Sequence, residues 1–166
     1  MKDRVRLFQA VVTPVVLYAS ATWALRQDVE KQLRTAWRRM LRYVFRIFRQ
    51  KSTTHDGEQE TWVEYIQGAA RKVHTLAQRY GVEEWTRTHR RKKWSLAGRL
   101  ARANDRRWSQ QILSWKPNYG VGRHQGRPFT RWSDHLERYA GGNWQQIAED
   151  VGLWAILEEG FLECDG

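Results

Sequence analysis

The 166-residue chain has one cysteine, three prolines and no apolar run that approaches the length of a membrane span. The single thiol, at Cys164, excludes an internal disulfide and any metal site built from several cysteines. A helix that crosses a bilayer needs roughly 20 apolar residues, and Met1 is not followed by the hydrophobic segment of a signal peptide. We therefore expect an intracellular protein that has no membrane partner.

The residue groupings that carry most enzyme chemistry are also missing. No two aspartates are adjacent, so the converging carboxylates of a two-metal nucleotidyl-transfer site are not visible. The five histidines have no spacing that suggests zinc, and the glycine-rich stretch 120–127 lacks the Gly-Lys-Ser/Thr ending of a phosphate-binding loop. We expect no catalytic residue, no metal and no cofactor in this chain.

One short string keeps an enzymatic alternative open. Ser133-Asp134-His135 matches a triplet used by metal-dependent endonucleases of the apurinic type. Those enzymes place the triplet on a loop of a large two-sheet sandwich, whereas here it follows Trp132 in a short stretch with helical periodicity. A metal-dependent nuclease built around Asp134 and His135 is therefore the alternative function.

Positive charge is abundant and unevenly distributed. The chain has 29 Lys and Arg against 18 Asp and Glu, which gives a net charge of +11. Every basic residue lies at or before Arg138, and the segment 139–166 holds six acidic residues and no basic one. The basic part indicates a polyanionic partner, most simply nucleic acid. The acidic segment could either dock on the basic part or keep it soluble.

Helical periodicity dominates, and no region is rich in strand signals. We predict an all-α protein: a small helical bundle, then further short helices and an acidic C-terminal segment. A polar stretch over residues 50–60 predicts a boundary between a segment 1–50 and a region 51–166, which contains a basic loop over 116–130. The predicted helices cover residues 3–17, disturbed near Pro14, and then 28–48, 61–80, 82–103, 106–115, 129–139 and 143–161, the last broken at Gly152.

The clearest predicted element is the helix over residues 28–48. Its apolar residues recur at three- and four-residue steps, while four arginines follow one another at four-residue steps on a different side: Arg34, Arg38, Arg42 and Arg46. That row contains no acidic residue, so the arginines repel one another unless an anion lies alongside. We predict that they contact phosphates.

Two further basic groups are candidates for phosphate contact. The first is a run of consecutive charges before Trp94, and the second steps by four through the predicted loop: Arg90, Arg91, Lys92 and Lys93, and Arg123, Arg127 and Arg131. Arginines combined with aromatic residues are typical of nucleic-acid binding. Consecutive charges on a helix cannot all face one partner, so some of the first group are expected to be solvated.

Four blocks, taken together, resemble the reverse transcriptases of non-LTR (LINE-type) retrotransposons. Residues 15–23 (Val-Val-Leu-Tyr-Ala-Ser-Ala-Thr-Trp) resemble the segment after the polymerase core, and residues 38–42 resemble the basic helix that follows it. Residues 94–100 are similar to a Trp-x-x-x-Gly-His block, with Arg99 in place of histidine. The C-terminal pattern Gly-Arg-Pro…Arg-Trp…Asp…Trp matches Gly126, Arg127, Pro128, Arg131, Trp132, Asp134, Gly142, Trp144, Ala148, Asp150 and Trp154.

The resemblance implies the helical thumb and the region that follows it. The fingers and palm, with the family's catalytic Asp-Asp, would lie upstream of Met1. The expected function is thus a nucleic-acid-binding C-terminal fragment of an RNA-directed DNA polymerase, which grips the primer–template backbone and has no active site of its own. Expected partners are RNA, DNA or an RNA–DNA hybrid and, as an alternative, a separate palm and fingers polypeptide. A nuclear location and a non-functional helical relic remain alternatives.

Overall fold

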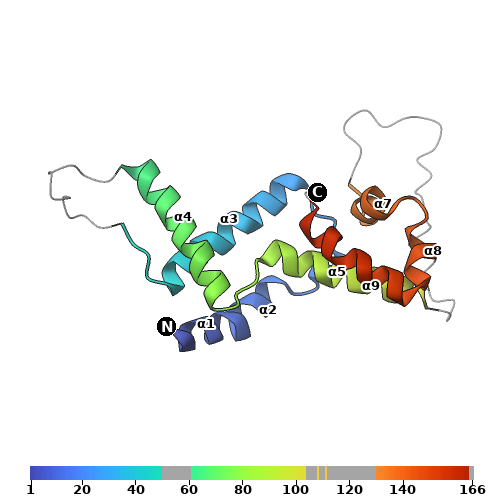
Figure 1. The fold of residues 1–166 in the computed structure, drawn as a ribbon, viewed down its shortest axis with the longest axis horizontal. Coiled ribbons are helices and arrows are strands. Elements are labelled where there is room, and N and C mark those ends of the chain that lie inside the picture. The colour runs from blue at the N-terminus through green and yellow to red at the C-terminus, as the bar shows by residue number, and fades with distance from the viewer. Residues whose placement is uncertain (50–60, 104–107, 109–110, 112–129, 165–166) are drawn as a thin grey trace. The chain divides into compact units, whose positions relative to one another are not determined.

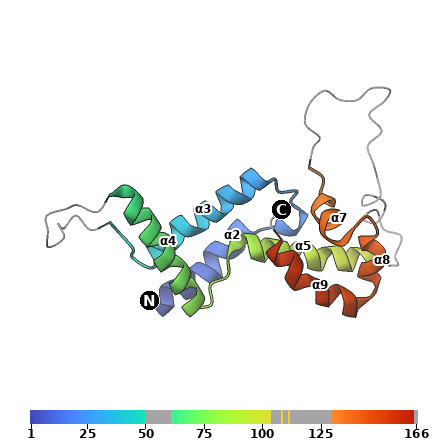
Figure 2. The ribbon, with the colours of Figure 1, turned by 45° about the horizontal axis from the view of Figure 1, so that its top comes forward.

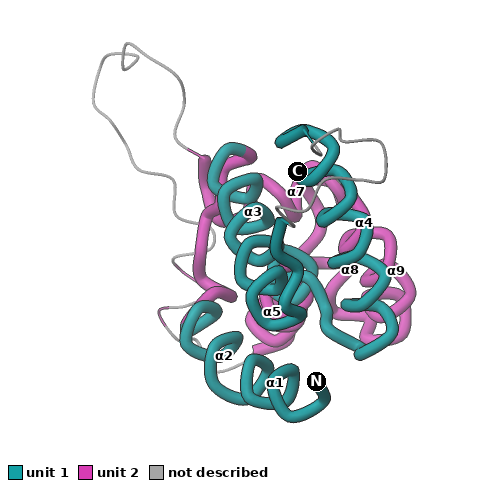
Figure 3. Tube along the Cα trace, turned by 90° about the vertical axis from the view of Figure 1, so that its left-hand side faces the viewer, with its two compact units in different colours: residues 1–18, 28–88 teal, residues 19–27, 89–166 magenta. Residues whose placement is uncertain are grey.

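The computed structural model of the protein describes residues 1–49, 61–103, 108, 111 and 130–164 (Figure 1, Figure 2). All regular secondary structure in these ranges is helical, which confirms the predicted all-α class. The chain divides into two compact units: unit 1 comprises residues 1–18 and 28–88, and unit 2 comprises residues 19–27 and 89–166 (Figure 3). Three predictions fall on residues that the structure does not describe, or describes only at single positions, and so stay predictions. They are the boundary near residue 50, the helix over 106–115 and the loop over 116–130.

Unit 1 begins with a helical run that spans residues 2–16. It consists of α1 (Lys2–Leu7), a π-helical segment (Phe8–Val12) and α2 (Thr13–Val16). Pro14 has no amide hydrogen, and its ring crowds the carbonyl group four residues earlier, so a wider turn immediately before it relieves that contact. The predicted helix is therefore present, and the disturbance near Pro14 takes the form of a π-helical segment.

The third helix, α3 (Gln27–Val44), ends earlier than its periodicity predicts. Arg46 adopts a φ of 56°, and the amide of Ile47 donates a 2.8 Å hydrogen bond to the carbonyl of Arg42. With the 3.2 Å bond from the amide of Arg46 to the carbonyl of Tyr43, this is a Schellman motif. The prediction that the helix continues to residue 48 is wrong, because the chain reverses direction at Arg46.

The next helix, α4 (Trp62–Arg79), has the start and the stop that its sequence predicts. The hydroxyl of Thr61 accepts from the amide of Glu64, while the Glu64 carboxylate accepts from the hydroxyl and the amide of Thr61, which together form a capping box. The two bonds that the Glu64 carboxylate accepts, from the hydroxyl and the amide of Thr61, lower the pKa of Glu64. Gly81 follows the helix with a φ of 63°, the left-handed conformation that favours glycine.

Helix α5 (Trp85–Ala101) has its first turn in unit 1 and the remainder, from His89, in unit 2. In unit 1, Trp85 stacks on Phe8 with ring centroids 5.8 Å apart, and its indole N–H donates to the hydroxyl of Thr13. These contacts hold the start of α5 against the helical run 2–16.

Unit 2 combines the later part of α5 with α7 (Asp134–Ala140), α8 (Trp144–Glu149) and α9 (Val151–Glu163). The break between α8 and α9 falls at Asp150, not at the predicted Gly152, which lies inside α9. The Asp150 carboxylate accepts a 3.0 Å hydrogen bond from the amide of Leu153 and so caps α9. A capping side chain satisfies an amide that glycine would leave to water, which explains the position of the break.

Candidate nucleic-acid interface

Four arginines at and beyond the end of α3 form what we call the arginine surface: Arg38, Arg39, Arg42 and Arg46. Trp37 and Leu41 are buried, whereas Arg38, Arg39 and Arg46 are exposed and Arg42 is half-buried. Because successive helical positions differ by about 100°, the three helical members lie within an arc of about 100°. Among the described residues, no carboxylate forms an ion pair with any of the four.

Arg34 does not belong to this surface. Its Nε lies 2.8 Å from Oε1 of Glu84, which also accepts a hydrogen bond from the hydroxyl of Thr86. The prediction that the arginine row has no neighbouring carboxylate is therefore wrong for Arg34. The carboxylate comes from a residue 50 positions later in the chain, which periodicity within one helix cannot reveal.

The consecutive charges before Trp94 do not form one exposed patch. Arg90 is 3% exposed and donates to the carbonyl of Leu162, and Lys93 is 2% exposed with its Nζ 5.4 Å from the centroid of the Trp132 ring. Arg91 lies 3.6 Å from a carboxylate oxygen of Glu158. These contacts remove Arg90 and Lys93 from the candidate interface, leave Lys92 exposed, and show the acidic C-terminal segment docked on a basic side chain at Arg91.

Of the third predicted group, only Arg131 is described. Its side chain is exposed, and its backbone amide donates a 2.8 Å hydrogen bond to Oδ2 of Asp134. Arg123 and Arg127 lie outside the described ranges. The phosphate contacts predicted for these three residues stay predictions.

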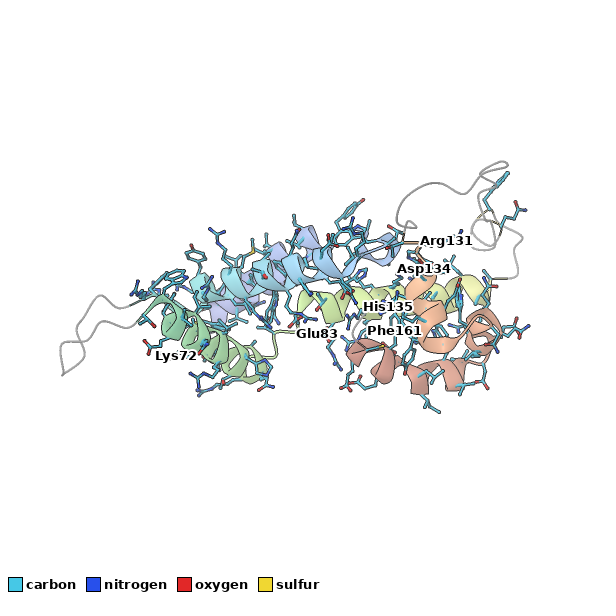
Figure 4. The ribbon with its side chains drawn as sticks, turned by 90° about the horizontal axis from the view of Figure 1, so that it is seen from above. Lys72, Glu83, Arg131, Asp134, His135 and Phe161 are labelled. Carbon is cyan, nitrogen blue, oxygen red and sulfur yellow. The ribbon has the colours of Figure 1, made fainter. Side chains whose placement is uncertain are left out.

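Asp134 and His135 serve the local packing of α7. The Asp134 carboxylate accepts the bond from Arg131, and the His135 ring lies 4.8 Å from the ring of Phe161 on α9 (Figure 4). Nε2 of His135 is buried and has no hydrogen-bond partner among the described residues. Among the described residues, no three His, Cys, Asp or Glu side chains are grouped so that they could hold a metal ion. No described feature therefore favours the nuclease alternative.

The environment of His135 predicts a specific acid sensitivity. Burial, together with the positive charges of Arg90, Lys93 and Arg138, lowers its pKa from 6.5 to about 4. Between these two pKa values the unfolded chain binds a proton at this imidazole and the folded protein does not. The contribution of His135 to the free energy of unfolding is therefore fully present above about pH 6.5 and decreases as the pH falls toward 4. Allowing for solvent screening of the half-buried ring, the loss is about 1–2 kcal/mol.

We expect His135→Phe to reduce the fall in thermal unfolding temperature between pH 6.5 and 5, a range above most carboxylate titrations. The control is His74→Gln, since His74 is exposed on α4, and this variant should retain the wild-type fall. An unchanged pH dependence in His135→Phe would show that the imidazole is protonated equally in both states.

The tryptophans of the two later sequence blocks, at 94–100 and 126–154, lie in the core of unit 2. Trp94 and Trp154 stack with ring centroids 3.6 Å apart, and each indole N–H donates to the carbonyl of the other residue. Gly98 lies one turn after Trp94, where a Cβ atom would stand 2.6 Å from Nε1 of Trp154. Buried members of the same cluster include Trp144 and Ala148, with Trp132 packed against it. Trp94, Trp144 and Trp154 are therefore core residues of unit 2.

Sequence reasoning missed three exposed aromatic residues and one arginine near the end of α3. Tyr43, Phe48 and Trp62 are exposed, and the Arg49 guanidinium lies 6.0 Å from the Trp62 ring centroid. A helix that continues to residue 48 would place Phe48 on its buried apolar side. The wrong prediction of the helix end therefore led to the exposure of Phe48 being missed. The sequence Arg46-Ile47-Phe48-Arg49, in which two apolar residues lie between two arginines, is the signal that could have found this group.

Comparison with known proteins finds one curated relative. The chain is 26% identical, over 165 aligned residues, to an uncharacterized transposon-derived protein of Caenorhabditis elegans. The alignment covers 94% of this chain and 54% of the relative, so the chain spans about half the length of the relative that it matches. No protein-family model and no solved structure matches the chain. Within the described ranges, none of the helices has the length and apolar character of a membrane span.

Proposed function

We propose that the chain derives from a transposon and is the thumb-like, nucleic-acid-binding C-terminal part of a retrotransposon reverse transcriptase. The transposon origin is supported by the similarity to a transposon-derived protein along nearly the whole chain. The narrower assignment to a reverse transcriptase thumb rests on the four blocks that resemble that family. The arginine surface is the single observation that carries the binding function, because its exposed guanidinium groups have no carboxylate partner among the described residues.

In this proposal, the arginine surface contacts phosphates of RNA, DNA or an RNA–DNA hybrid. Arg38 and Arg42 lie one helical turn apart, where like charges repel, and a phosphodiester chain between them replaces repulsion with charge-assisted hydrogen bonds. Such contacts hold the backbone without reading base edges, as a polymerase that copies any sequence requires. The chain then acts inside the cell, in the cytoplasm or nucleus, together with the palm and fingers of the polymerase, and its own residues supply no active site.

A salt titration tests this function. Four phosphate contacts give a slope of log K against log salt of about −3.6, or a fall in affinity of about 100-fold between 50 and 200 mM salt. This is less than the 10³–10⁵ fall expected for about 6–10 contacts, because Arg34, Arg90 and Lys93 have left the interface. The measurement is fluorescence anisotropy of a labelled RNA–DNA hybrid, and a slope near zero would refute the proposed function.

A further inference from the structure

Three large aromatic side chains are exposed at the junction between α3 and α4 in unit 1. Tyr43, Phe48 and Trp62 are 60%, 58% and 60% exposed, while Trp37 and Trp85 in the same unit are buried. Single exposed apolar residues are ordinary in proteins, but three rings close together leave a sizeable apolar area in contact with water. The phosphate contacts proposed above do not involve these rings and do not explain their exposure.

Contacts within unit 1 place the three rings at one site. The rings of Tyr43 and Phe48 meet edge to face with centroids 6.2 Å apart, and the neighbouring Arg49 lies over the Trp62 ring. The hydroxyl of Tyr65 donates a 3.1 Å hydrogen bond to the carbonyl of Ile47, which holds the first turn of α4 beside the end of α3. Tyr43, Phe48 and Trp62 therefore belong to one surface, which we call the aromatic surface.

The reversal of the chain at Arg46 creates this surface. Phe45 is buried and stacks on Tyr80 with centroids 6.0 Å apart, so it takes the last core position of α3. Because Arg46 then adopts a left-handed conformation, Phe48 does not continue the buried stripe and faces solvent. Arg46 and Arg49, which are both exposed, flank Phe48 in the sequence.

The combination of arginines and exposed aromatic rings indicates which class of ligand the aromatic surface binds. Arg39 precedes Tyr43 by one helical turn, and Arg46 and Arg49 flank Phe48, so the aromatic surface lies among positive charges. An uncharged apolar partner would remove water from the guanidinium groups of Arg39 and Arg46 without supplying a counter-charge, at a high cost in free energy. A nucleic-acid duplex offers phosphates but keeps the faces of its bases stacked inside. A single strand offers both phosphates and accessible base faces.

We infer that Tyr43, Phe48 and Trp62 stack on bases of a single-stranded segment of nucleic acid whose phosphates contact Arg39, Arg46 and Arg49. This inference rests on the proposed nucleic-acid binding and specifies that the nucleic acid at the aromatic surface is single-stranded. Unpaired template beside a primer–template duplex, or a free single strand, has the required chemistry. Base stacking tolerates any sequence because every base has an aromatic face.

Two probes of equal length and charge separate stacking from phosphate contact: labelled oligothymidylate and a labelled abasic oligodeoxynucleotide. We expect the full chain to bind oligothymidylate at least about tenfold more tightly than the abasic probe. The variants Tyr43→Ala, Phe48→Ala and Trp62→Ala should each weaken oligothymidylate binding about tenfold and leave abasic binding nearly unchanged. Anisotropy gives both affinities, and circular dichroism shows whether each variant keeps its helices.

Matched variants control for general effects of losing an exposed ring. Tyr18 is 81% exposed and also belongs to unit 1, but it has no contact with the aromatic surface, so Tyr18→Ala should bind both probes as the wild type does. The conservative variant Trp62→Phe keeps an aromatic face and should retain the preference for oligothymidylate. A variant that loses helical content is replaced by its leucine counterpart, which has no aromatic face and is expected to bind as the alanine variant would.

The outcomes separate the two proposals. Equal affinity of the wild type for both probes, with a steep salt dependence, would overturn the stacking inference and leave the proposed function intact. A preference for oligothymidylate that is as large in all three alanine variants as in the wild type would also overturn it. Absence of salt-dependent binding to either probe and to the hybrid would refute both.

Discussion

Reversing the charge at Arg38 and Arg42 together is expected to weaken nucleic-acid binding by at least about 100-fold near physiological salt. Each substitution removes one phosphate contact and places a carboxylate where the backbone lies, so attraction is replaced by repulsion. The slope of log K against log salt should become shallower by about 2. Neither side chain packs in the core: Arg38 is exposed, Arg42 is half-buried, and neither has an ion pair among the described residues. The variant should therefore keep its helical circular dichroism.

The matched control reverses two charges on another helix of unit 1. Lys72, labelled in Figure 4, and Arg79 are both exposed on α4. The double variant Lys72→Glu with Arg79→Glu changes the net charge by the same amount. This control should weaken binding only a few-fold, through the general field of the protein. Equal losses in the two double variants would mean that binding depends on total charge and not on the arginine surface.

Truncation of Trp154 is expected to cost about 3–5 kcal/mol of folding stability. The substitution Trp154→Ala removes the ring stacked on Trp94 with centroids 3.6 Å apart, together with the indole N–H that donates to the carbonyl of Trp94. Whole domains are stable by only about 5–15 kcal/mol, so a loss of this size lowers the unfolding temperature by many degrees. Thermal denaturation followed by circular dichroism and by near-ultraviolet tryptophan signals measures it.

A conservative variant divides the cost between stacking and hydrogen bonding. Trp154→Phe keeps an aromatic ring in the cluster but loses the N–H that donates to the carbonyl of Trp94. Its expected cost is about 1–3 kcal/mol, from the lost hydrogen bond and a smaller buried ring. A Trp154→Ala variant within about 1 kcal/mol of the wild type would show that the stack contributes little to the fold.

Local signals predicted most helices because their causes are local. The capping box of Thr61 and Glu64 and the left-handed Gly81 lie within a few residues of the ends that they define. The end of α3 was not predictable in this way. Its apolar periodicity continues to Phe48, and only the burial of Phe45 against Tyr80, a residue 35 positions later, favours the turn at Arg46.

The candidate interface was predictable in type but not in membership. A row of arginines is visible in the sequence, yet its first member is neutralised by Glu84, and Arg90 and Lys93 are drawn into unit 2 by Leu162 and Trp132. These partners are distant in the chain, so composition and spacing carry no record of them. Patterns within one helix identify a charged face, whereas only tertiary packing decides which charges reach a ligand.

A hydrogen atom is the whole side chain of Gly98, and through that gap the Trp154 indole reaches the carbonyl of Trp94. Tryptophan and glycine at this spacing can therefore be retained by selection for folding alone. A descendant that keeps both inherits the scaffold of unit 2, whatever has become of its arginines. The residues that make a relative recognisable in sequence are therefore core residues of unit 2, whereas the arginines proposed to bind the ligand lie in unit 1. Similarity in the first set does not show that the second set still binds.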